Sequence, residues 1–96
     1  MAARPPSTLT FAIGGPLERD DLPALYERVC GLLESSGAAL AVCDVAGVGA
    51  DAVTVDALAR LQLAARRHGC RITLRHTSDE LRALIAFMGL NEVLPG

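Results

Sequence analysis

The segment LAVCDVAGVGADAVTVDALARL, residues 40–61, constrains the fold of this chain more than any other. An apolar run over 38–45 contains Asp44 near its end, a short glycine loop follows, and Asp51 then opens a segment with helical spacing. An apolar run without polar alternation is typical of a strand that is buried on both faces, so we expect a sheet covered by helices. In such α/β folds, sites lie where a strand leads into a helix, which places a candidate site in the loop at 46–54.

Strands and helices alternate along the whole chain. The predicted elements are strands over 8–13, 38–45 and 70–76, helices over 21–36 and 52–68, a third helix that follows Thr77 and ends at Gly89, and a short final strand at 93–94. This order predicts a small α/β domain with a mostly parallel or mixed four-stranded sheet and about three helices. With 96 residues the chain forms one domain over 8–96, after a flexible leader over 1–7 in which two prolines block regular structure.

The third helix has a clear start signal and a predicted core face. The segment Thr77–Glu80 has the pattern of a capping box, with Thr77 as the N-cap and Glu80 reaching back to it. Helical spacing then places four apolar residues on one face, which we expect to be the core side. These residues are Leu81, Leu84, Ile85 and Met88.

Composition excludes several classes of function. The net charge of −2, with both signs interspersed, leaves no basic surface for nucleic acid, and 3% aromatic residues leave no stacking platform for single strands. No apolar run reaches the length of a membrane span, and the N-terminal segment has no apolar signal core. Three cysteines without a CxxC motif fit a reducing compartment, so we expect a cytoplasmic protein that does not insert into a membrane.

The chain offers no organised catalytic or metal-binding constellation. Its two histidines, His68 and His76, lack metal-ligand spacing. Nothing beside Cys30, Cys43 or Cys70 forms the Cys/His/Asp arrangement that activates a nucleophile. We therefore expect no enzyme activity, no metal and no cofactor.

The glycine loop has the pattern of a dinucleotide-binding fingerprint. Residues 47–52, GVGADA, match GxGxxA and lie between a predicted strand and a predicted helix. However, Asp51 places a carboxylate at the helix N-terminus where a pyrophosphate would bind, and no acidic residue ends the next strand. Binding of a nucleotide or another small molecule at the Gly47–Asp51 loop is therefore an alternative rather than the main interpretation.

Two aspartates flank this loop. Asp51 is predicted to be the N-cap of the following helix, where its charge favours the helix dipole. Asp44 ends a buried strand, so its carboxylate needs N–H partners from the loop and would orient that loop. A catalytic pair formed by the two carboxylates is the less favoured alternative.

The order and spacing of these residues resemble the core motif of STAS domains, "D-L-S-G-V … D-S-S-G-L … L". STAS domains form bacterial anti-sigma factor antagonists and also occur at the ends of sulfate transporters and in stressosome proteins. The matching residues here are Asp44-Val45-Ala46-Gly47-Val48, Asp51, Val55 and Leu58. The segment Gly14–Leu17 resembles the family's "G-x-L-D" strand end, and GCRITLRHTSDELRALIAFMGLNEVLP resembles the closing strand, helix and "G-L-x-x-x-L". The resemblance implies the STAS fold, with the first family strand shortened or merged into the leader.

This resemblance also directs attention to a missing phosphorylation site. In STAS antagonists, a Ser or Thr after the loop aspartate is phosphorylated by a partner kinase that is also the anti-sigma factor. This chain has Ala52 and Val53 at those positions, and neither side chain accepts phosphate. Thr54 carries the only hydroxyl of the turn, but helical spacing places it with Leu58 on the core side. We expect its hydroxyl to bond back to the backbone rather than to serve as a phosphosite.

The resemblance implies that a protein partner binds the 46–54 loop and the exposed side of the second helix. The candidate partner-binding residues are Gly47, Gly49, Asp51, Ala52, Asp56, Arg60 and Leu63. Leu63 falls opposite the core stripe of Thr54, Leu58, Leu61 and Ala65. The expected partner is an anti-sigma factor or another kinase-like protein. The alternative is an accessory role, as a subunit of a transporter or of another complex.

Overall fold

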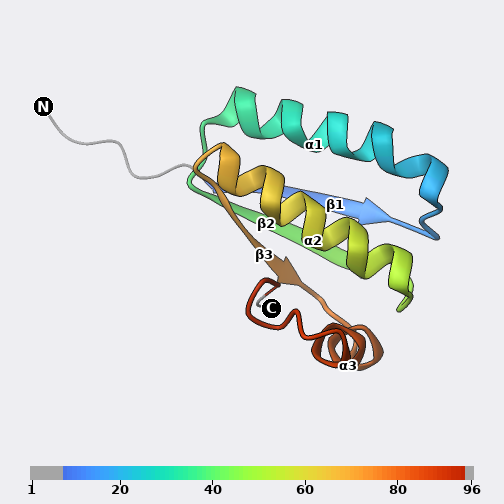
Figure 1. The fold of residues 1–96 in the computed structure, drawn as a ribbon. Helices are drawn as coiled ribbons and strands as arrows, with labels where there is room; N and C mark the ends of the chain where they lie inside the picture. The colour runs from blue at the N-terminus through green and yellow to red at the C-terminus, as the bar shows by residue number, and fades with distance from the viewer. Residues whose placement is uncertain (1–7, 95–96) are drawn as a thin grey trace, which may run out of the picture.

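Three parallel strands form the sheet in the computed structural model, which describes residues 8–94. They are β1 (Thr8–Gly14), β2 (Leu40–Gly47) and β3 (Arg71–Arg75), in the order β1-β2-β3. The helices are α1 (Leu22–Ser36), α2 (Ala52–Arg67) and α3 (Asp79–Phe87), with a short 3-10 helix at Arg19–Asp21 (Figure 1). The parallel α/β class is thus confirmed, whereas the expected leader over 1–7 lies outside the described residues.

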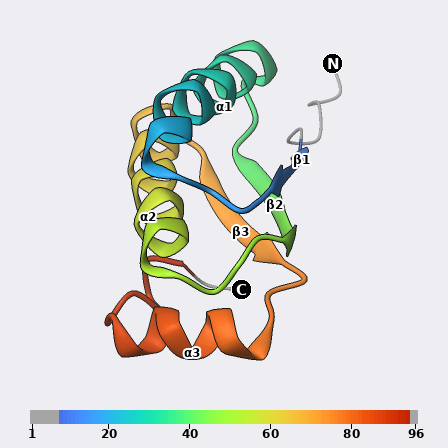
Figure 2. The same ribbon diagram turned by 90° about the vertical axis from the view of Figure 1, so that its right-hand side faces the viewer.

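Helices α1 and α2 cover one face of the sheet, and α3 lies across the carboxyl ends of β2 and β3 (Figure 2). On the covered face, Phe11, Cys43 and Leu74 stand in one register row and are buried. Over residues 8–94 no helix covers the opposite face. The expectation of a strand buried on both faces is therefore wrong for β2, because the inward residues alternate with outward ones such as Leu40, which is 37% exposed.

The predicted fourth strand at 93–94 is also wrong, and a single side chain explains why. In β3 the N–H and C=O of Ile72 point away from β2, where a further strand would pair. Gln62 of α2 takes both groups, because its Nε2 donates to Ile72 O over 2.8 Å and its Oε1 accepts from Ile72 N over 2.8 Å. The Gln62 Nε2 also donates to Val93 O over 2.9 Å. Leu94 N donates to Leu90 O instead, so the segment forms turns.

The start of α3 differs from the predicted capping box by one residue. Ser78, not Thr77, is the N-cap, and its Oγ accepts a hydrogen bond from Leu81 N over 3.1 Å. The predicted core face is right for Leu81, which is buried, but wrong for Met88, which is 39% exposed. The reason is that α3 ends at Phe87, so Met88 lies in the turn beyond the last helical residue.

The other boundaries agree with the predictions to within about two residues, as is usual for the ends of helices and strands. The largest shift affects β2, which continues through Ala46 and Gly47 because Gly47 pairs with Gly14 of β1. The loop between β2 and α2 is consequently shorter than predicted and covers 48–51. Gly37, at the end of α1, has a φ of 59°, the left-handed conformation expected of a glycine that ends a helix.

Candidate functional site

The two aspartates singled out in the sequence lie on either side of the loop after β2, Asp44 within the strand and Asp51 at the start of α2. Asp51 is the N-cap of α2, and its Oδ1 accepts a hydrogen bond from Thr54 N over 2.8 Å. Asp44 Oδ1 accepts a hydrogen bond from Ala46 N over 2.9 Å, but Ala46 belongs to β2, so the expected N–H partner from the following loop is not present among residues 8–94. Each carboxylate therefore has a structural role in the local backbone. The N-terminus of α2, where a phosphate would bind, already carries the Asp51 carboxylate.

Asp44 has a second partner that the sequence patterns did not indicate. His76, directly after β3, has its Nδ1 3.1 Å from Asp44 Oδ2. The Ala46 N–H, in the first place, and the His76 side chain lower the pKa of Asp44 below its usual range. The contact follows from the sheet topology, because β2 and β3 are neighbours and Asp44 and His76 lie at the carboxyl ends of these strands.

The first turn of α2 contains no accessible hydroxyl group. Ala52 is exposed and Val53 is half-buried at the two positions that the resemblance to STAS antagonists assigns to the phosphorylated residue. Thr54 is 0% exposed, which confirms the prediction of a core side chain. Its Oγ1 has no hydrogen-bond partner among the described residues, so the expected bond back to the backbone is wrong.

The seven candidate partner-binding residues form what we call the docking face: Gly47, Gly49, Asp51, Ala52, Asp56, Arg60 and Leu63. Six are exposed and Asp56 is half-buried. Leu63 is 54% exposed, in agreement with the predicted helical phase. Arg60 Nε donates to Asp56 Oδ2 over 3.0 Å, one helical turn away. The face is therefore accessible to a protein, and its single ion pair is solvent-exposed and contributes little to stability.

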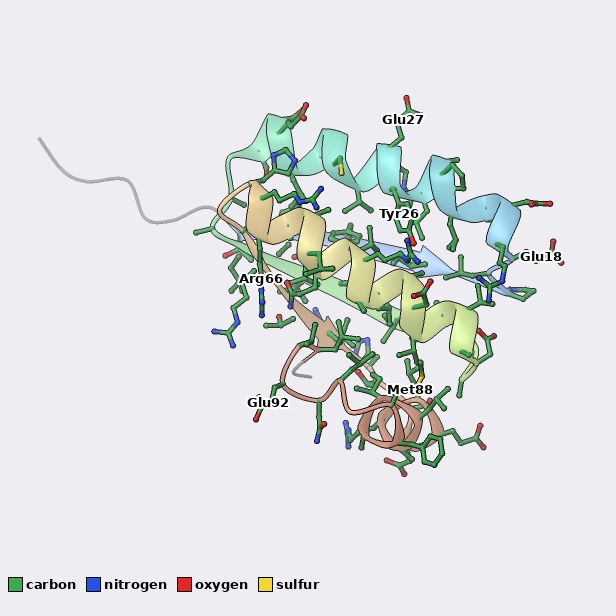
Figure 3. The ribbon with its side chains drawn as sticks, viewed as in Figure 1. Glu18, Tyr26, Glu27, Arg66, Met88 and Glu92 are labelled. Carbon is green, nitrogen blue, oxygen red and sulfur yellow. The ribbon has the colours of Figure 1, made fainter. Side chains whose placement is uncertain are left out.

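A groove between α1 and α2 extends the docking face. Its volume is about 310 Å³, and it is lined by Tyr26, Arg60, Leu63, Ala64 and Arg67. Tyr26 points from α1 toward α2, whereas Glu27 lies on the opposite side of α1 and points away from α2 (Figure 3). The Tyr26 Oη is buried without a hydrogen-bond partner among residues 8–94, and burial raises the pKa of this phenol. The groove therefore combines an exposed leucine and arginines with an unsatisfied hydroxyl.

The sequence patterns did not indicate a role for Gln62. It is 1% exposed and lies between Leu61 and the exposed Leu63 on α2. A polar residue at the border of an apolar stripe is ordinarily read as solvated. In this chain its amide hydrogen-bonds the outer edge of β3 and Val93 O, which protects an edge strand from further pairing.

No group of three or more His, Cys, Asp or Glu side chains is placed to hold a metal ion within the described part of the chain. No helix over residues 8–94 is long and apolar enough to span a membrane.

The fold and the capped loop before α2 define a small α/β domain of the STAS type. The family model described as "Mlab, STAS domain" matches residues 1–95. The chain therefore belongs to the STAS domain family. A sulfate transporter family protein from Wolinella succinogenes has a similar crystal structure, with a TM-score of 0.70 and 22% sequence identity over 97% of this chain and 75% of that one. At this identity the likeness concerns the fold alone. No curated protein sequence matches the chain.

Proposed function

We propose that this STAS domain is a non-enzymatic regulatory protein of the anti-sigma factor antagonist type. It docks a kinase-like or anti-sigma partner in the cytoplasm through the docking face and has no phosphorylation switch. A phosphate at a helix N-terminus adds about two negative charges and three acceptors beside a docking surface, which is how such a switch disrupts binding. With Ala52 and Val53 at the acceptor positions, binding to the partner is constitutive.

The burial of Thr54 is the single observation that carries this proposal. A kinase needs its substrate hydroxyl in solvent, but the Thr54 side chain is 0% exposed beneath the first turn of α2. Asp51 Oδ1 holds the Thr54 N–H, so exposing this residue requires opening the helix start. The loop and Leu63 remain accessible, which supports docking without a switch.

A second candidate function is an accessory subunit of a transporter or of another complex. The matching family model is described as "Mlab, STAS domain", and the similar crystal structure belongs to a sulfate transporter family protein. In this role the docking face would bind a permanent partner subunit. Constitutive binding without a switch is common to both candidate functions, so the identity of the partner distinguishes them.

Small-molecule or nucleotide binding at the Gly47–Asp51 loop is the alternative from another class. It is disfavoured because the Asp51 carboxylate occupies the start of α2 and would repel phosphate. A nucleotide that binds the folded state would raise its stability by about 2.7 kcal/mol at a hundredfold excess over Kd. A saturable rise in Tm with ATP or GTP would favour this alternative.

The proposal is tested by comparing protein capture by the wild type and two matched variants. Leu63→Glu places a charge on the docking face, whereas Leu40→Glu changes another exposed leucine at the start of β2. We expect the wild type and Leu40→Glu to capture the same partner from native cells, identified by mass spectrometry, and Leu63→Glu to lose it. Circular dichroism should show that both variants are folded. Equal capture by the two variants would place the docking surface elsewhere.

The missing switch is tested separately by intact-mass measurement. The captured partner, or a purified kinase-like anti-sigma factor, is incubated with the domain and ATP. We expect an unchanged mass. A stoichiometric phosphate on Thr54 would contradict the constitutive mode and would support regulated binding.

A further inference from the structure

A cavity of about 480 Å³ lies beyond the carboxyl end of β3, between α3 and the C-terminal turns. We call it the β3–α3 pocket. Its volume falls within the range of about 300–1,000 Å³ that is typical of small-molecule sites. Its apolar lining comes from Leu74, Ile85, Ala86 and Leu94. Three of these residues are core side chains, at most 7% exposed, so the pocket reaches the hydrophobic core.

Polar side chains from three separate segments also line the pocket. They are Thr77 in the β3–α3 loop, Arg82 on α3 and Asn91 in the C-terminal turns. No carboxylate is among the described lining residues. Arg82 has only a weak partner, because its Nη1 is 3.9 Å from an Asp79 carboxylate that is fully exposed to solvent. The guanidinium is therefore free to bind an anion in a bidentate manner.

Thr77 provides an independent indication that a polar group is missing from the pocket. Its Oγ1 is buried and has no hydrogen-bond partner among residues 8–94. An unsatisfied buried hydroxyl is unfavourable, and native proteins contain few of them. Because Thr77 also lines the pocket, a ligand bound there could supply the acceptor that this hydroxyl lacks.

We propose that the β3–α3 pocket binds a small carboxylate with an apolar body. The carboxylate accepts hydrogen bonds from Arg82, Asn91 and the Thr77 hydroxyl, and the apolar body packs on Leu74 and Ile85. An anion is preferred over a cation because the described lining contains an arginine and no acid. An apolar body is required because the inner wall consists of core side chains. The docking face and the α1–α2 groove share no residue with this pocket.

The probe for this site is octanoate, titrated into the isotopically labelled full chain and followed by amide NMR shifts. Octan-1-ol, which lacks the charge, and butyrate, which lacks most of the apolar chain, are the matched controls. We expect saturable shifts with octanoate, centred on Leu74, Ala86 and Asn91, and affinities at least about tenfold weaker for both controls.

Three variants separate ligand binding from folding. Arg82→Gln should weaken octanoate binding about tenfold or more, because a charge-assisted hydrogen bond is lost. Arg71→Gln, at the opposite end of β3, should bind octanoate as the wild type does. Thr77→Val removes the orphan hydroxyl, so it should keep or raise Tm while weakening octanoate binding. A merely structural role for Thr77 would not produce this opposite pair of effects.

Several results would overturn the proposal. The absence of saturable shifts at about 10 mM octanoate would show that the pocket binds no such ligand. Octan-1-ol binding as tightly as octanoate, or an unchanged affinity in Arg82→Gln, would show that the carboxylate is not recognised. Butyrate binding equally well would show that the apolar wall plays no part.

Discussion

Asp44 and His76 are 32 positions apart in the sequence, and their side chains meet at 3.1 Å at the carboxyl ends of β2 and β3. His76 has a φ of 61°, a left-handed conformation that is uncommon for a residue with a side chain. The other carboxylate oxygen of Asp44 accepts the N–H of Ala46. Asp44 therefore links the carboxyl end of β2 to the loop before α3.

The first prediction concerns acid stability. Hydrogen bonds from Ala46 N–H and His76 lower the pKa of Asp44 in the folded state. A carboxyl group with a lowered folded pKa contributes stability that is fully present above its unfolded pKa and is lost as the pH falls through the folded pKa. The wild type should therefore lose stability below about pH 4, and Asp44→Asn should lose less over the same range.

The measurement is urea unfolding at a series of acid pH values. Asp20→Asn, at an exposed carboxylate on the short 3-10 helix, is the charge-matched control. The interpretation of Asp44 fails if Asp44→Asn and the wild type lose stability in parallel over this range.

The second prediction concerns the buried amide of Gln62. Gln62→Leu keeps a side chain of similar volume. It leaves the Ile72 N–H, the Ile72 C=O and the Val93 C=O without their hydrogen-bond partner. Unsatisfied buried groups cost about 1–3 kcal/mol each, so the free energy of unfolding should fall by about 3 kcal/mol or more. Arg66→Leu, at an exposed site of the same helix, should change it by no more than about 0.5 kcal/mol. Equal stabilities of the two variants in urea would contradict the assigned role.

Thr54 gives a prediction of opposite sign. Because the Thr54 hydroxyl is buried without a partner, replacement by the similarly shaped Val should leave stability unchanged or raise it by up to about 1 kcal/mol. Thr54→Ala, which also removes a methyl group from the core, should be less stable than Thr54→Val. Thermal unfolding compares the three proteins. A clear loss of stability in Thr54→Val would show that the hydroxyl has a hydrogen-bond partner in solution.

The cysteines should differ in reactivity. Burial raises the pKa of the Cys43 thiol to about 12, with a smaller contribution from the Asp44 charge, and burial also raises the pKa of Cys70. Since the thiolate is the reactive form, neither should react with an aromatic disulfide reagent at neutral pH while the protein is folded. The half-buried Cys30 should react first. Absorbance should therefore report one rapid thiol in native buffer and all three in denaturant; a rapidly reacting Cys43 would contradict its position in the core.

Local patterns in the sequence predicted the three helices and the three strands of the sheet, and some of the interactions within one helical turn. Asp51 is the cap of α2, Leu63 lies on its exposed side, and α1 ends at Ser36, all as predicted. Such features depend on residues three or four positions apart, so helical spacing and turn chemistry reveal them directly.

The sheet edges, the open face and the pocket were decided by the tertiary structure. The apolar run of β2 did not reveal that, over residues 8–94, no helix covers one face of the sheet, because an apolar pattern does not distinguish partly exposed Leu and Val from buried ones. The contact of Asp44 with His76 depends on β2 and β3 being neighbours. The absence of a strand at 93–94 depends on the Gln62 amide, which reaches Ile72 and Val93 from another element. The family motif and the local periodicity lie within short segments, so the sequence reveals them. Contacts between distant segments form only when the chain folds, so local patterns do not show which strand edges and side chains come together.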